Sequence, residues 1–298
     1  MIDTHAHLDF KDFDEDREEA IQRAFDNGVK SIINVGVDLD SSIKSIALAE
    51  KYENVFASVG LHPHCFSKAE KDLRFTIYDL REGINRLKTL AKHKKVVAIG
   101  ECGLDYYQRS ANSDQETIDE KSKELQKKGF IEQIKLAREL NLPVVVHCRE
   151  AWEDVFEIIS RSNQSSAFPF LERSSRNSSK PSFSKFVLHC YSGDKSDTEK
   201  FLELPNIYFS FSGNITYPKP VEQANKFSEV IQRIPLDRIM LDSDSPYLAP
   251  QARRGKRNEP AFVKFIADKI AEIKGISVKE VESTTDKSSI NFFGLFDL

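Results

Sequence analysis

Two of the seven histidines, His5 and His7, lie one residue apart directly after a short apolar run. Side chains two apart on a β-strand point to the same side. If a strand ends here, both imidazoles face the same way and could bind one divalent cation, since neutral imidazole is a common metal ligand. The H-x-H pattern is weak by itself, because a pair of surface or core histidines gives the same spacing.

The metal hypothesis gains support because other ionisable residues follow short apolar runs in the same way. Five predicted strands end in such residues, namely His5 with His7, Glu101, His147, His189, and Asp242 with Asp244. Packing alone does not account for this recurrence, because a buried charge needs a compensating partner. Divalent cations would supply that partner, so we predict a metal centre where these strand ends meet.

The elements that position these residues form a regular alternation of apolar runs and longer segments with helical periodicity. The predicted strands are Met1–Thr4, Ser31–Val35, Val55–Val59, Val96–Ile99, Pro143–Val146, Phe186–Leu188, Ile207–Ser210 and Ile239–Leu241. Eight strand-then-helix units predict an α/β fold, a single (β/α)₈ TIM barrel over residues 1–298 with its site at the C-terminal ends of the strands. An open doubly wound sheet shares the alternation, but its glycine-rich phosphate loop is absent here.

The sequence also predicts the bounds of two helices and the character of two connecting segments. Helices are expected over residues 18–27, closed by Gly28, and over residues 260–274, opened by a proline and closed by Gly275. Residues 161–185, rich in serine and basic residues, predict a mobile insert on the face opposite the site. Residues 108–122 follow the fourth strand and either shape substrate access or serve as a connection.

Composition narrows the class of protein. The 298 residues are 40% hydrophobic, enough for a large core, and no apolar run reaches the roughly 18 residues of a membrane helix. A net charge of −4 argues against a general nucleic-acid binder, though not against a local phosphate site. No signal-peptide pattern is visible and the four cysteines lack zinc-site spacing, so we expect reduced thiols and a cytoplasmic location.

Three of the cysteines, Cys102, Cys148 and Cys190, directly follow predicted ligands. Because neighbouring residues on a strand point to opposite sides, we expect these thiols to face away from the site. There they would pack as small core residues between strands and helices.

His62 and His64 follow the third strand in the sequence Gly60-Leu61-His62-Pro63-His64. Their position after a strand allows contact with a substrate, and His62 is also a candidate catalytic residue. A rigid turn with two solvated imidazoles is an equally open interpretation.

A basic cluster follows the eighth strand, on the same predicted face as the site. It consists of Arg253, Arg254, Lys256 and Arg257. A solvated loop has the same composition, but the location favours contact with substrate phosphates, and Arg254, Lys256 and Arg257 are the candidate contacts.

Taken together, six motifs resemble the TatD deoxyribonuclease family of the amidohydrolase-like metal-dependent hydrolases. They are Ile2–Asp9, Gly60–His64, Gly100–Tyr107, Val146–Ala151, His189–Gly193 and Asp244–Pro250. They occur in the family's order and cover nearly the whole chain. This chain reads Asp242-Ser243-Asp244 where the family commonly has Glu-Thr-Asp, which leaves open any contact made by the longer side chain.

The resemblance implies two divalent cations. His5, His7 and Asp244 match the ligands of one cation, His147 and His189 match those of the other, and Glu101 matches a bridging carboxylate. Related hydrolases often use a carbamylated lysine as the bridge, so Glu101 favours the TatD type. Mixed imidazole and carboxylate ligands suit Mg²⁺, Mn²⁺ or Zn²⁺.

We therefore predict a deoxyribonuclease that removes nucleotides from DNA in the 3′–5′ direction with a metal-activated water, with Asp244 as general base and Glu101 and His62 as further catalytic residues. The alternative keeps the metals but assigns another ester or amide, such as an aminoacyl-tRNA or a small lactone. A barrel that only binds nucleic acid or protein would have lost ligands, and none is missing. DNA is the expected partner, no membrane is expected, and the sequence is compatible with a monomer.

Overall fold

A computed structural model of the chain describes residues 1–66, 77–107, 119–163, 184–218 and 221–295. Eight strands form one parallel sheet in sequential order. They are β1 (Ile2–Ala6), β2 (Ser31–Val35), β3 (Val55–Val59), β4 (Val96–Asp105), β5 (Val144–Arg149), β6 (Phe186–Leu188), β7 (Ile207–Phe211) and β8 (Ile239–Leu241).

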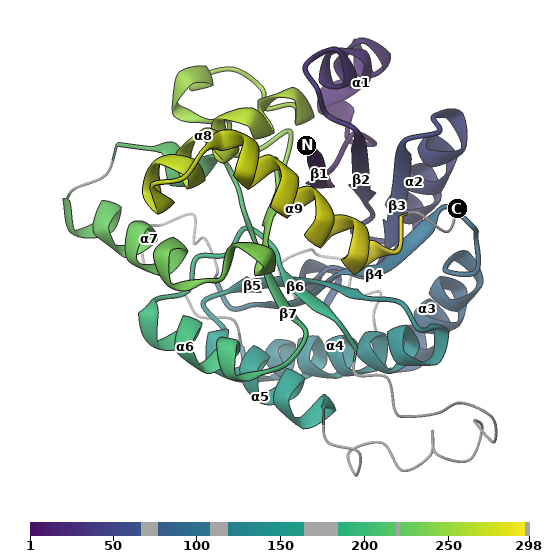
Figure 1. The fold of residues 1–298 in the computed structure, drawn as a ribbon. Coiled ribbons are helices and arrows are strands. Elements are labelled where there is room, and N and C mark those ends of the chain that lie inside the picture. Colours follow the sequence, from purple (N-terminus) through teal and green to yellow (C-terminus); the bar gives the residue numbers. More distant parts are fainter. Residues whose placement is uncertain (67–76, 108–118, 164–183, 219–220, 296–298) are drawn as a thin grey trace.

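Helices follow the strands and surround them (Figure 1). They are α1 (Arg17–Asp26), α2 (Leu39–Lys51), α3 (Ile77–Leu90), α4 (Glu120–Leu140), α5 (Trp152–Ser162), α6 (Lys195–Glu203), α7 (Val221–Arg233), α8 (Val263–Lys274) and α9 (Val278–Phe293). The last of these, α9, crosses in front of the strands in Figure 1 rather than joining the ring around them.

The end of β1 meets the segment that follows β8. Ala6 pairs with Ser245 in a parallel bridge, and the His7 amide donates to the Ser245 carbonyl at 2.8 Å. The Asp244 amide donates in turn to the His5 carbonyl at 2.9 Å. These bonds close the sheet into a ring, so the predicted (β/α)₈ barrel is confirmed.

Two strands extend well past their predicted ends. β4 continues to Asp105 and β5 to Arg149, so Glu101 and His147 lie inside strands and the prediction that they terminate them is wrong. The apolar runs stop earlier because the strands become polar where they enter the site. The pairing of β4 with β5 is irregular between Ile99 and Cys102. Gly100 is required there, because it has φ +141° and a Cβ would lie 2.5 Å from the Val145 carbonyl oxygen.

The helix boundaries read from the sequence are confirmed to within a turn. α1 ends one residue before Asn27, and Gly28 follows with φ +85°. Pro260 opens a short 3₁₀ turn that leads into α8, and Gly275 closes α8 in the left-handed conformation that a residue without Cβ adopts at little cost.

The inward faces of the strands form an apolar layer near α9, which we call the interior cluster. It consists of Ile33, Val35, Phe56, Val97, Ala98, Val145, Val187, Met240, Phe292 and Phe293. Phe292 and Phe293 come from α9, so this helix closes the barrel interior at the end away from the predicted site. Burial of these side chains stabilises the fold in proportion to the apolar area removed from water.

The connecting segments fall largely outside the described residues. The predicted insert begins within α5, since Arg161 and Ser162 are helical, and residues 164–183 are not described. Of the segment 108–122, only the end is described, where the Asp119 side chain accepts from the Ser122 amide and starts α4. In the described part of the chain, no helix combines the length and the apolar character needed to cross a membrane.

None of the four cysteines, which all lie in the described residues, forms a disulfide bond. Cys102 and Cys148 are buried in the core around the barrel. Cys190 does not follow the expected alternation, because β6 ends at Leu188 and Cys190 lies in the following turn. Its sulfur lies 3.7 Å from the amide nitrogen of Asn214, in the loop after β7.

Candidate metal centre

The predicted ligands converge at the C-terminal ends of the strands, around a cavity of about 510 Å³ that we call the mouth. Among the predicted site residues, those that line it are His7, His62, His64, Glu101, His147, His189 and Asp244. They come from β4, β5 and the loops after β1, β3, β6 and β8, so residues far apart in the sequence meet because the barrel is closed.

His5, His7 and Asp244 form the first group of donor atoms. The Nε2 atoms of His5 and His7 lie 3.1 Å apart, and the Asp244 carboxylate is 4.0 Å and 3.7 Å from them, respectively. Nδ1 of His7 lies 2.9 Å from the Val35 carbonyl, which can only accept, so this nitrogen carries the proton. Nε2 of His7 therefore presents a lone pair to the group, as metal-binding histidines do.

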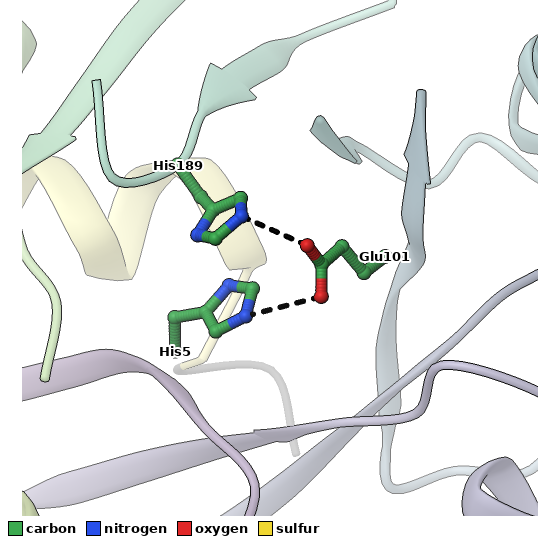
Figure 2. Close-up of side chains that lie close together, drawn as sticks. All are labelled: His5, Glu101 and His189. Atoms are coloured by element: carbon green, nitrogen blue, oxygen red, sulfur yellow. Dashed lines mark ion pairs between the residues drawn. The ribbon is translucent and has the colours of Figure 1, made fainter. Parts of the chain in front are cut away.

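Glu101 lies between two groups of imidazoles, and Figure 2 shows its contact with one member of each group, His5 and His189. Its Oε2 is 3.4 Å from Nε2 of His5 and 3.7 Å from Nε2 of His7. Its Oε1 is 2.8 Å from Nε2 of His189 and 2.8 Å from Nδ1 of His147. One buried carboxylate thus has one oxygen directed to each group, which is the arrangement a bridging ligand needs.

The second group contains His147, His189 and His62. Nδ1 of His147 is 3.3 Å from Nε2 of His189, and His62 approaches Oε1 of Glu101 to 3.5 Å. Nδ1 of His62 accepts the backbone N–H of His64 at 3.1 Å, so the proton of a neutral ring is on Nε2. Burial holds the pKa of His62 well below its usual value, which keeps the ring neutral. His62 is therefore placed as a hydrogen-bond donor rather than as a lone-pair ligand.

Asp105 orients two histidines of the mouth and was not singled out from the sequence. Its Oδ2 lies 3.1 Å from Nε2 of His147 and 3.2 Å from Nε2 of His64. Such a carboxylate holds the ring proton on Nε2 and directs Nδ1 of His147 toward the centre. Asp105 lies an even number of residues after Glu101, a spacing that puts two side chains on the same side of a strand. This spacing indicates a site residue only if the strand continues to residue 105.

Asp242 also supports the centre, although its side chain is shorter than the glutamate that the family resemblance leads one to expect at this position. Its Oδ2 accepts from Ser210 at 2.7 Å and from the Cys190 amide at 3.0 Å, and it lies 3.5 Å from Nδ1 of His189. The shorter side chain thus fixes the backbone after β6 and places negative charge beside the His189 ring.

The electrostatics of the mouth fit divalent cations. Burial raises the pKa of Asp244 to about 7 and lowers the pKa of His5 to about 4. Burial alone would raise the pKa of Glu101, but the surrounding imidazoles, His189 first, hold it well below its usual value. The described residues contain three sets of donor atoms in which the atoms of each set lie within 4.8 Å of one another, and each set combines imidazole and carboxylate groups. This is the ligand chemistry of divalent transition metals and of Mn²⁺ or Mg²⁺ at carboxylates.

The predicted basic contacts lie outside the lining of the mouth. Arg257 binds Asp16 at 2.9 Å and packs over Phe13, while Arg254 lies 4.3 Å from the ring centre of Tyr217. Lys256 is exposed. Contact of these three residues with phosphate stays a prediction.

Arg149, which was not predicted from the sequence, also lines the mouth. It lies 3.6 Å from the ring centre of Tyr107, an approach typical of a cation–π contact. Because Arg149 is two residues beyond His147 on β5, the same alternation that identified His147 would have identified it.

Comparison with known proteins agrees with this geometry. Residues 2–294 match the family described as TatD related DNase. The metal-dependent hydrolase YabD of Bacillus subtilis is 34% identical, with 98% of each chain covered. The 3′–5′ ssDNA/RNA exonuclease TatD of Cronobacter sakazakii is 30% identical, over 98% of this chain and 97% of the relative. The crystal structure of the TatD homologue YJJV of Escherichia coli has a TM-score of 0.77 at 28% identity, over 99% of this chain and 98% of that one.

The barrel, the converging imidazoles and carboxylates, and these relatives define a metal-dependent hydrolase. Within that class, the chain belongs to the TatD family, because the family match extends over nearly its whole length.

Proposed function

We propose that this hydrolase is a deoxyribonuclease that removes nucleotides from the 3′ end of DNA. The observation that supports it best is the position of Glu101, with one oxygen 2.8 Å from His189 and the other 3.4 Å from His5. His5, His7 and Asp244 would hold one divalent cation, His147 and His189 a second, with Glu101 between them. Such cations, when bound, lower the pKa of water and polarise phosphoryl oxygens.

Asp244 is the proposed proton acceptor. Its side chain is only 14% exposed and lines the mouth, beside the imidazoles of His5 and His7. A carboxylate oxygen in this position can accept a proton from an attacking water, as a general base must.

His62 is the proposed hydrogen-bond donor to the substrate. Because its Nδ1 is occupied by the His64 amide, its Nε2–H is available in the mouth. A neutral donor there can bind a phosphate oxygen or the leaving oxygen without repelling the bound cations. Arg149 would add a fixed positive charge at the same cavity, and charged donors form the stronger hydrogen bonds to phosphate.

The experiment is digestion of a single-stranded DNA oligonucleotide labelled at either end, with protein purified without chelator. We expect shortening from the 3′ end, loss of cleavage in chelator, and recovery with Mg²⁺, Mn²⁺ or Zn²⁺. The double variant Glu101→Ala, His147→Ala is the matched control. Unchanged cleavage by this variant would refute the assignment.

A substrate panel at equal metal loading separates the other hydrolase activities. If an aminoacyl ester or a lactone is hydrolysed while DNA is left intact, the metal centre acts on a different ester and the deoxyribonuclease proposal fails.

A further inference from the structure

Tyr247 is an unusual surface residue. The residue is 53% exposed, and the other exposed large hydrophobic residues in the described part of the chain are Ile43 and Val278. Of these three, Tyr247 is the one that lines the mouth. Large aromatic rings are normally buried because of their apolar area, so a ring exposed beside a metal centre indicates a surface that a ligand covers.

The backbone under this ring is held firmly. The Tyr247 amide donates to the Asp244 carbonyl at 2.8 Å, and the Tyr247 carbonyl accepts from the Asn258 side chain at 2.6 Å. Asn258 is buried and also binds the Ser243 carbonyl at 2.6 Å. The Tyr247 backbone is therefore fixed relative to Asp244 before any ligand arrives, which reduces the entropy lost on binding.

Phe10 continues the aromatic surface toward the metal ligands. Its ring stacks on His7 with centres 4.7 Å apart and planes 15° from parallel, and it meets the Tyr247 ring edge-on at 6.3 Å. Both rings line the mouth. The series His7, Phe10, Tyr247 therefore leads from a predicted metal ligand to the exposed rim without an intervening charge.

The cavity has the chemistry of one terminal nucleotide. The metal ligands at its base suit a phosphate, and an aromatic wall suits the flat face of a nucleobase, because every base presents such a face. Its volume of 510 Å³ lies within the range of roughly 300–1,000 Å³ of small-ligand sites, so the cavity accepts one nucleotide rather than a nucleic-acid double helix.

We propose that Tyr247, together with Phe10, is the platform on which the unpaired terminal base of the nucleic acid stacks. The proposal rests on the proposed nuclease function and adds the residue that selects the substrate. A base inside a duplex is already stacked on both faces and must leave the helix to reach the ring, so the platform favours single strands. It is tolerant of base identity, since the contact is with the face and not with the hydrogen-bonding edge.

The test compares two single strands that differ only at the 3′-terminal nucleotide, which is either normal or abasic. The wild type should lose about 5- to 150-fold in kcat/KM on the abasic strand, the range expected for one stacked base. Tyr247→Leu, which has bulk but no aromatic face, should cleave both strands equally. Tyr247→Phe should keep the preference, and Ile43→Ala, at an exposed residue outside the lining of the mouth, is the matched control.

Binding without chemistry gives a second readout. A strand with 2-aminopurine at its 3′ end is titrated with protein in chelator, where stacking quenches its fluorescence. Wild type and Tyr247→Phe should quench it and Tyr247→Leu should not. If Tyr247→Leu quenches as strongly and still discriminates against the abasic strand, the platform is elsewhere. If no protein cleaves either strand, the nuclease proposal fails, and the quenching alone decides whether Tyr247 stacks on a base.

Discussion

The mouth and the interior cluster are neighbouring regions of one barrel with opposite chemistry. The mouth buries imidazoles and carboxylates, whereas the interior cluster buries apolar side chains against Phe292 and Phe293 of α9. On β5, Val145 belongs to the interior cluster and His147, two residues later, lies at the mouth. Val187 and His189 repeat this step along β6 and the turn that follows it.

Stability and chemistry depend on different regions of this molecule. Apolar burial in the interior cluster stabilises the fold. The mouth takes charged groups out of water, which is unfavourable unless cations or hydrogen bonds compensate. Because the two regions are one strand step apart, variants in each should separate loss of stability from loss of activity.

The largest effect is expected for Glu101→Gln at the mouth. Losing the carboxylate between the two imidazole groups should lower kcat/KM on DNA at least about 10³-fold. The metal-free variant should unfold at a lower temperature than metal-free wild type, because the imidazoles that hold the Glu101 pKa down lose their ionic partner. Activity assays at a temperature where both proteins are folded, and thermal unfolding in chelator, check this. A loss of activity no larger than the loss of folded protein would show that Glu101 is mainly structural.

Phe292→Ala tests the interior cluster. Removing a buried ring should cost about 3–5 kcal/mol of unfolding free energy, measured in urea, through lost transfer energy and the cavity left behind. At a temperature where the variant is folded, its kcat and metal content should equal those of the wild type. Loss of activity without loss of stability would contradict the separation of the two regions.

Asp105→Asn probes the support of the metal ligands. Weaker orientation of His147 should reduce metal affinity about 10- to 100-fold, measured by competition with a chelating dye. Asp154→Asn is the control, because Asp154 binds Tyr106 at 2.6 Å and does not line the mouth. If both variants bind metal equally well, Asp105 does not orient a ligand.

The smallest predicted effect is the pH dependence of metal uptake. The pKa of Asp244 is about 7 in the metal-free fold, because burial disfavours its charge. Below that pH the carboxyl group keeps a proton that a cation must displace, so affinity should rise about tenfold per pH unit toward pH 7 for each proton released. Calorimetry in buffers of different ionisation enthalpy counts the protons. The Asp244→Asn variant should show a flatter profile, and an unchanged slope would contradict the assignment.

Much of the site could be predicted from the sequence because a barrel places residues that end strands at one face. Apolar runs located the strands, and the polar residues after them identified the six predicted ligands. Asp105 and Arg149 were missed because β4 and β5 continue into polar sequence, where apolar character no longer marks a strand. The contacts of Asp242 depend on Ser210, on β7, and on His189, just after β6, so no local pattern could give them. The ion pair between Arg257 and Asp16 also joins residues far apart in the sequence, so no local pattern could give it either.

The most direct test of the metal centre is anomalous diffraction from crystals grown with Mn²⁺. We predict two anomalous peaks at the mouth, one beside His5, His7 and Asp244 and the other beside His147 and His189, with Glu101 between them. The absence of manganese at the mouth, or its binding only at surface carboxylates, would contradict the account.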